Sequence, residues 1–96
     1  MAPFQANQDA IPQDMVTRVG SAAGLVARIQ QDYAMQAEAA PGEDQRQALA
    51  TRARAAAERA IDEQGISIQD YNAVLSAAET DQELERRLLD AAREVL

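Results

Sequence analysis

The sequence predicts a small all-α protein, an antiparallel helical bundle of two long helices plus two shorter helices that together form a broken third leg. Alanine, the residue with the highest helix propensity, supplies 22 of the 96 residues. Apolar residues recur at spacings of three and four over long stretches, which is the period of a helix. Gly65 and Ser67 mark the end of one helix and the start of the next. Because 96 residues support one hydrophobic core, we expect a single helical-bundle domain, over residues 12–96. Residues 1–11 are expected to form a flexible N-terminal segment.

The first long helix is predicted over residues 12–39. Pro12 suits the first turn of a helix, where its missing N–H costs nothing, and Pro41-Gly42 ends the pattern. The apolar positions repeat about every 3.5 residues, which is typical of a helix that lies along another at a shallow angle. These positions are Met15, Val19, Ala22, Val26, Ile29 and Tyr33.

The second long helix is predicted to begin at Glu43 and Asp44, two acids that suit the positive end of the helix dipole. Gly65 ends it, because a left-handed residue is favoured there and only glycine adopts that conformation without strain. The inner face of this helix consists almost entirely of methyl groups, so a neighbouring backbone can approach closely. Its members are Leu49, Ala53, Ala56 and Ala60, with Ala57 and Ile61 beside them.

Two shorter helices are predicted after Gly65. Ser67 caps the first of them, and Ile66 is expected to pack back on Ile61. Thr80 is predicted to cap the second, with Glu83 reaching back in a capping box. The last helix then carries one apolar stripe of Leu84, Leu88, Ala91 and Val95 and a second, surplus stripe of Leu89, Ala92 and Leu96.

Charge and composition exclude several classes of partner. The formal net charge is −7, and the nine basic residues, all arginine, are interleaved with 16 acids. Nucleic acid and anionic membranes need clustered basic residues, so neither is an expected partner. The chain has no cysteine and no apolar run near the ~18 residues of a membrane-spanning helix, so neither disulfides nor stable membrane insertion is expected.

The sequence offers little catalytic chemistry. Histidine, cysteine and lysine are absent, and no hydroxyl has a basic partner to activate it. We therefore expect no enzyme activity, no catalytic residue, no cofactor and no metal site. The acidic clusters are interpreted as helix starts and solvated faces, with a weak divalent-metal site as the alternative; they are Glu43-Asp44, Asp62-Glu63 and the group Asp81, Glu83 and Glu85. Tyr33 and Tyr71 are interpreted as residues at the core edge, with a ligand-stacking pair as the alternative.

Gly20 and Gly24 lie four residues apart inside the first helix, where two glycines cost about 1.5–2 kcal/mol relative to alanine. One interpretation is a groove for another helix, for instance from a second copy of the chain, and the other is neutral drift. Together with the surplus stripe, the candidate interface is Gly20, Gly24, Leu89, Ala92 and Leu96.

The residues Gly-Ile-Ser-Ile-Gln-Asp-Tyr-Asn (65–72), followed by Ala77-Ala78 and Asp-Gln-Glu-Leu (81–84), resemble domain-of-unknown-function family 4168. The upstream Ile-Gln-Gln-Asp-Tyr (29–33) is also similar, so the resemblance covers roughly residues 13–92. Thr80 and Gln82 stand where the family usually has asparagine and proline. The resemblance implies small bacterial proteins, exported to the periplasm or cell envelope in many members. It implies no assigned activity and no functional residue.

The leading hypothesis is therefore a non-enzymatic interaction protein, expected to form a homodimer or bind another protein in the periplasm or cell envelope. The alternative is a small carrier of apolar ligands or lipids that uses a gap between the second helix and the last. The polar, unpatterned residues 2–8 suit the start of a mature exported protein, with an ordinary cytoplasmic N-terminus as the alternative.

Overall fold

A computed structural model describes residues 11–95, and every regular element within that range is a helix. The elements are α1 (Gln13–Ala39), α2 (Glu43–Glu63), α3 (Ile68–Ala78) and α4 (Gln82–Arg93). The predicted all-α fold is confirmed, and the two long helices have the predicted bounds to within one residue.

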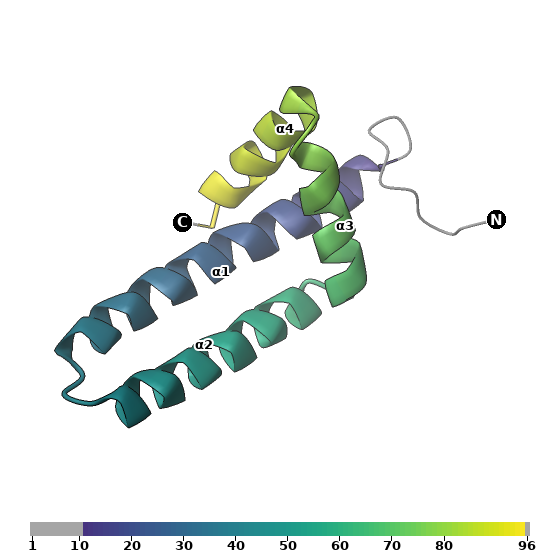
Figure 1. Ribbon diagram of the computed structural model, residues 1–96. Coiled ribbons are helices and arrows are strands. Elements are labelled where there is room, and N and C mark those ends of the chain that lie inside the picture. The colour runs from purple at the N-terminus through teal and green to yellow at the C-terminus, as the bar shows by residue number, and fades with distance from the viewer. Residues whose placement is uncertain (1–10, 96) are drawn as a thin grey trace.

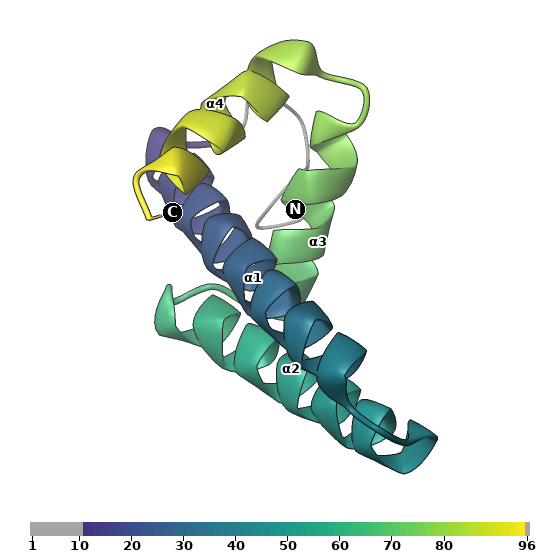
Figure 2. The ribbon, with the colours of Figure 1, turned by 90° about the vertical axis from the view of Figure 1, so that its left-hand side faces the viewer.

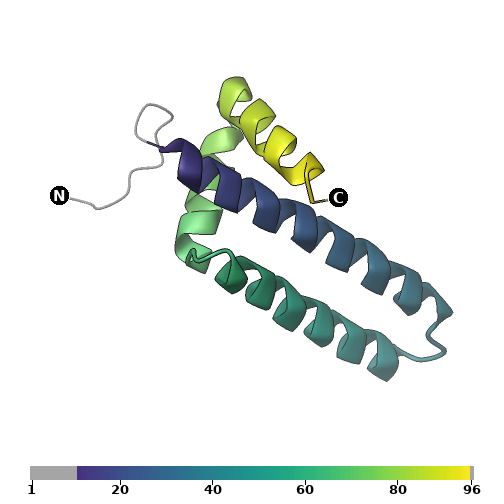
Figure 3. The same ribbon diagram turned by 180° about the vertical axis from the view of Figure 1, so that it is seen from behind.

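The helix α1 lies in the middle of the molecule (Figure 1). The helix α2 runs antiparallel along one side of it, and α4 lies on the other side, as the view from behind also shows (Figure 3). The helix α3 crosses from the end of α2 to the start of α4, so α3 and α4 form the broken third leg and only α4 lies along α1. The molecule is elongated, with extents of 48 × 27 × 23 Å.

The hydrophobic core occupies one end of the molecule, where all four helices meet (Figure 2). Its largest fully buried side chains are Val16, Val19, Val74 and Leu84. Ile11, which the sequence assigned to the N-terminal segment, is only 5% exposed and packs in this core; residues 1–10 lie outside the described part of the chain. We call this part the bundle end. No residue from 25 to 59 is buried, and we call that segment the outer hairpin.

The turn between α2 and α3 forms as predicted. Gly65 has a φ of +77°, and its N–H donates to the Asp62 carbonyl at 2.9 Å. The Ser67 hydroxyl accepts from the Asp70 N–H at 3.0 Å and caps α3. Ile61 and Ile66 are both buried in the core. The local signals of this turn therefore determine the end of α2 and the start of α3.

The predicted cap of α4 was wrong by one residue. Asp81 is the N-cap, and its Oδ1 accepts from the Leu84 N–H at 3.2 Å. The Thr80 hydroxyl instead donates to the Ala77 carbonyl at the end of α3, at 3.4 Å. Glu83 accepts from Arg86 Nη2 at 2.7 Å. A carboxylate is as good a cap as a hydroxyl, so the Thr-Asp pair left two possible starts.

Arginines of α1 bind carbonyl groups at the C-terminal ends of two other helices. Arg18 Nη1 donates to the Gln64 carbonyl at 2.8 Å, and its Nε donates to Asp14 Oδ2 at 3.0 Å. Arg28 Nη1 donates to the Val95 carbonyl, just beyond α4, at 3.3 Å. A cation at a helix C-terminus is favourable because it meets the negative end of the dipole. Both contacts attach a neighbouring helix end to α1.

Candidate protein-binding surface

A groove between α1 and α2 runs along the outer hairpin and extends to Ala60 and Glu63 beside it. Two open hollows of about 450 and 310 Å³ lie along it, the larger near the turn at Pro41 and the smaller near Ala60. Each helix contributes lining residues at spacings of three or four, which places them on a single face of that helix, so the two hollows form one groove. We call it the hairpin groove. The main apolar residues of its floor are Leu25, Ile29, Leu49, Ala56 and Ala60.

The floor is only partly covered. Leu25, Ile29 and Leu49 are half-buried, although each lies between the two helices. Alanine and leucine at these positions let α1 and α2 approach but leave no third layer on this face. The floor therefore keeps apolar surface available for burial.

The rims of the groove carry charges of both signs. Asp32 lies on the α1 rim, and Arg59 and Glu63 lie on the α2 rim; Arg28 also lines this hollow, but its guanidinium donates to the Val95 carbonyl beyond α4. All four are exposed, and on each helix the arginine and the acid are four residues apart. Nearer the turn, the α1 rim has Gln36 and the α2 rim has Arg52.

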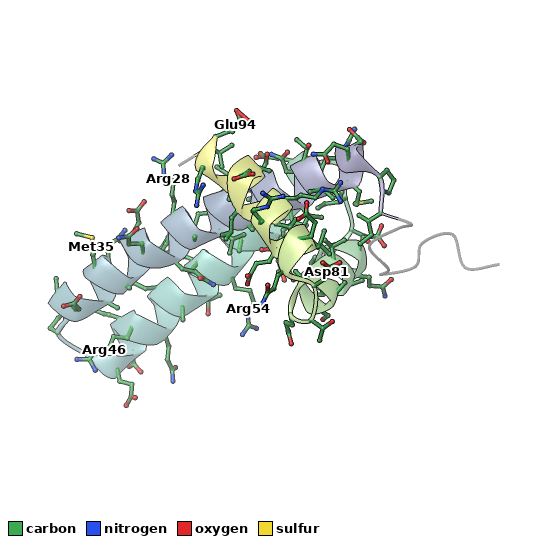
Figure 4. All side chains as sticks on the ribbon, turned by 90° about the horizontal axis from the view of Figure 1, so that it is seen from above. Arg28, Met35, Arg46, Arg54, Asp81 and Glu94 are labelled. Atoms are coloured by element: carbon green, nitrogen blue, oxygen red, sulfur yellow. The ribbon has the colours of Figure 1, made fainter. Side chains whose placement is uncertain are left out.

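The outer hairpin differs in charge from the rest of the chain. It contains five arginines and five acids, so the net charge of −7 resides outside it. Side chains such as Met35 on α1 and Arg46 and Arg54 on α2 extend away from the helices (Figure 4). The surface of the outer hairpin is therefore mixed in sign and neutral in total.

Another helix does pack against Gly20 and Gly24, but it is α4 of the same chain. A Cβ at Gly20 would lie 2.5 Å from Ala91 Cβ and 2.7 Å from the Leu88 carbonyl oxygen. At Gly24 it would lie 2.6 Å from Val95 Cγ2 and 2.8 Å from the Ala92 carbonyl oxygen. The expectation that these glycines form a groove for a second copy is therefore corrected, because both are buried inside the bundle.

The remaining candidate interface residues are not brought together on one free surface. Ala92 is 8% exposed and packs against α1 near Gly24. Leu89 is 50% exposed on α4. Leu96 lies outside the described residues. A C-terminal surface would thus rest on Leu89 alone among the residues that the structure describes.

The predicted acidic clusters lie at exposed or half-exposed positions. Within residues 11–95, no three acidic side chains converge in a way that would hold a metal ion. The two tyrosines lie apart. Tyr71 belongs to the core of the bundle end, where burial raises the pKa of its hydroxyl, and Tyr33 is half-buried in the outer hairpin.

The gap expected between the second helix and the last is not formed. α1 separates α2 from α4 (Figure 2), so no ligand space lies between these two helices. Sequence reasoning found Ile29, Leu49, Ala56 and Ala60 as inner positions but missed Leu25 and the charged rims. The sequence signal for the rims was the repeated spacing of four between an arginine and an acid. These residues form the edges of a groove only when α1 and α2 pack against each other.

The fold and this surface define a small helical bundle whose two longest helices extend beyond the core as an open hairpin. The chain belongs to the family described as Domain of unknown function (DUF4168), whose model matches residues 5–88. This match confirms the resemblance drawn from residues 65–72. Comparison with curated proteins and with solved structures finds no match. Between residues 11 and 95, no helix is both long enough and apolar enough to span a bilayer.

Proposed function

We propose that this protein is a non-enzymatic module that binds a protein partner through the hairpin groove. The observation that carries the proposal is the absence of any buried residue from 25 to 59, although both helices keep an apolar inner line there. Isolated helical hairpins are marginal in water, because most helical stability in proteins comes from tertiary packing. A partner segment in the groove would supply that packing to the half of the molecule that lacks it.

The chemistry of the groove favours a helix as the bound segment. Its floor is apolar and its rims carry charges of both signs, which suits an amphipathic helix with polar residues along its sides. Nucleic acid and anionic lipid would meet Asp32 and Glu63 beside each arginine. The hollows are open along their length, so a small apolar ligand would remain largely in contact with water.

We further propose a periplasmic or cell-envelope location, which the family resemblance supports. The measurement is fractionation of cells that express the native gene with a C-terminal tag. Recovery in the periplasmic fraction is expected, and recovery with cytoplasmic markers would reject this location without affecting the groove.

The groove is tested by photo-crosslinking in the native cell. A photoreactive phenylalanine analogue replaces Gln36, an exposed residue that lines the groove. The matched control replaces Gln47, an exposed glutamine of the same hairpin that is not among the lining residues. We expect a light-dependent adduct of discrete mass from position 36 and none from position 47. No adduct from position 36, or equal adducts from both positions, would reject the groove as the binding surface.

A further inference from the structure

We propose that the hairpin groove binds an amphipathic helix of a partner protein whose two flanks have opposite charge, with the acidic flank beside α2 and the basic flank beside α1. This inference rests on the proposed function, since it states the chemistry of the partner of the same groove. Three features support it: the length of the groove, the charge on each rim and the lack of ionic partners for those charges within the described chain.

The length of the groove matches a helix of about four turns. Its lining runs from Leu25 to Ala39 on α1 and from Gln45 to Glu63 on α2. At 1.5 Å per residue the α1 side is about 21 Å long, so a helix of about 15 residues covers both hollows. The apolar face of such a helix lies on the floor, and its two flanks lie along the two rims.

The two rims have opposite charge over the middle of the groove. Arg52 and Arg59 line it from α2 and are seven residues, or two helical turns, apart, so both lie on the same face. Asp32 lines it from α1. Asp32 and Ala56 are the lining residues of the smaller hollow that lie nearest the turn, so Asp32 lies across the groove from the segment between the two arginines. Glu63 follows beyond Arg59, at the limit of the groove toward the bundle end.

These rim charges have no ionic partner within residues 11–95. The ion pairs of that part of the chain lie inside α1 or α4 and include none of the three. The arginine four residues from Asp32 is Arg28, whose guanidinium donates to the Val95 carbonyl instead. No acid lies three or four residues from Arg52 along α2. Opposite charges on a bound helix would therefore complement groups that the chain itself leaves unpaired.

Rims of opposite charge also determine the direction of the bound helix. Turning a helix end for end in the groove exchanges its two flanks. A helix with one acidic and one basic flank therefore matches the rims in one direction only. A helix with two flanks of the same sign meets a repulsive rim in both directions, so strongly acidic and strongly basic helices are disfavoured.

Binding of three designed peptides to the purified protein, measured by fluorescence anisotropy, tests the inference. All are amphipathic helices of about 15 residues with the same leucine face. Their flanks are one of glutamate and one of lysine, two of glutamate, or two of lysine. The mixed peptide should bind several-fold more tightly than the glutamate peptide, which meets Asp32, and about tenfold more tightly than the lysine peptide, which meets Arg52 and Arg59.

Charge reversals on the rims should change this preference. Arg52→Glu combined with Arg59→Glu makes both rims acidic, so the double variant should prefer the lysine peptide. Asp32→Arg makes both rims basic and should prefer the glutamate peptide. Arg54→Glu is the matched control, because Arg54 is an exposed arginine of α2 that is not among the lining residues and extends away from the helices (Figure 4). This control should keep the preference of the wild type, and unfolding followed by circular dichroism checks that every variant is folded.

Direction is measured by NMR with a spin label at the N-terminus of the mixed peptide and of a second peptide whose flanks are exchanged. The two labels should broaden resonances at opposite ends of the groove, near Gln45 for one peptide and near Leu25 for the other. Equal affinity for the three peptides, no binding of the mixed peptide, or the same direction for both labelled peptides would overturn the inference. So would an equal change of preference in Arg54→Glu and in the double variant. If position 36 still crosslinks to a protein in the cell in any of these cases, the proposed function stands and only the charge pattern of the partner is rejected.

Discussion

The contact between α1 and α4 makes a specific prediction for Gly24→Ala. In an exposed helix interior this change stabilises by about 1 kcal/mol, because alanine has the higher helix propensity. Here the new Cβ would lie 2.8 Å from the Ala92 carbonyl oxygen and 3.2 Å from its Cα, and neither backbone atom can rotate away. Overpacking costs about 1–3 kcal/mol, and a backbone obstacle places this site toward the upper end. We expect a net loss of about 1–2 kcal/mol, or a melting temperature lower by about 5–10 °C.

Thermal and urea unfolding followed by circular dichroism measure this loss. Ala27→Gly, at an exposed position of the same helix, calibrates the propensity and should cost about 1 kcal/mol. Gly20→Ala should behave like Gly24→Ala, and adding Ala91→Gly should restore part of its loss, because Ala91 Cβ is the nearest atom to the new methyl group. A rise in melting temperature for Gly24→Ala would show that α4 does not rest on α1 at this point.

Three further predictions concern α2, α3 and α4. Gly65→Ala should destabilise by about 1–2 kcal/mol in urea unfolding, because its φ is +77° and a Cβ would lie 2.5 Å from Arg18 Nη1; a neutral effect would contradict that conformation. Asp81→Ala should cost about 1 kcal/mol and Thr80→Ala much less, and the reverse order would restore Thr80 as the cap of α4. Burial raises the pKa of Tyr71, so its neutral form is favoured by folding, and stability should fall as pH rises above the ordinary tyrosine value near 10; in Tyr71→Phe, urea titrations from pH 9 to 11.5 should show a smaller fall.

Local chemistry in the sequence predicts the helix boundaries well. Gly65 and Ser67 determine the end of α2 and the start of α3 because their preferences depend on their own backbone conformation and on one neighbouring N–H. Pro41 and Gly42 act in the same way at the end of α1. Such signals need no knowledge of which helices meet in space.

The packing of helices distant in sequence was not predictable in the same way. The 3.5-residue stripe of α1 correctly included Val19 and Ala22, but Ile29 and Tyr33 are only half-buried because the core stops before them. Of the two interpretations of Gly24, the close approach of another helix is the correct one, yet the stripe pattern does not identify which helix approaches. The groove likewise requires the register between α1 and α2, which single-helix periodicity does not contain.

The placement of every buried side chain at one end has a consequence for local stability. Amide hydrogens around Val16, Val19 and Leu84 should exchange with solvent only when the whole molecule unfolds, whereas those from residues 27 to 58 should exchange through local opening of two helices that have only each other. Sequence changes within that more labile half would therefore leave the folded core intact. The surface of the outer hairpin can therefore change in sequence while the core residues of the bundle end, which keep the protein folded, stay the same.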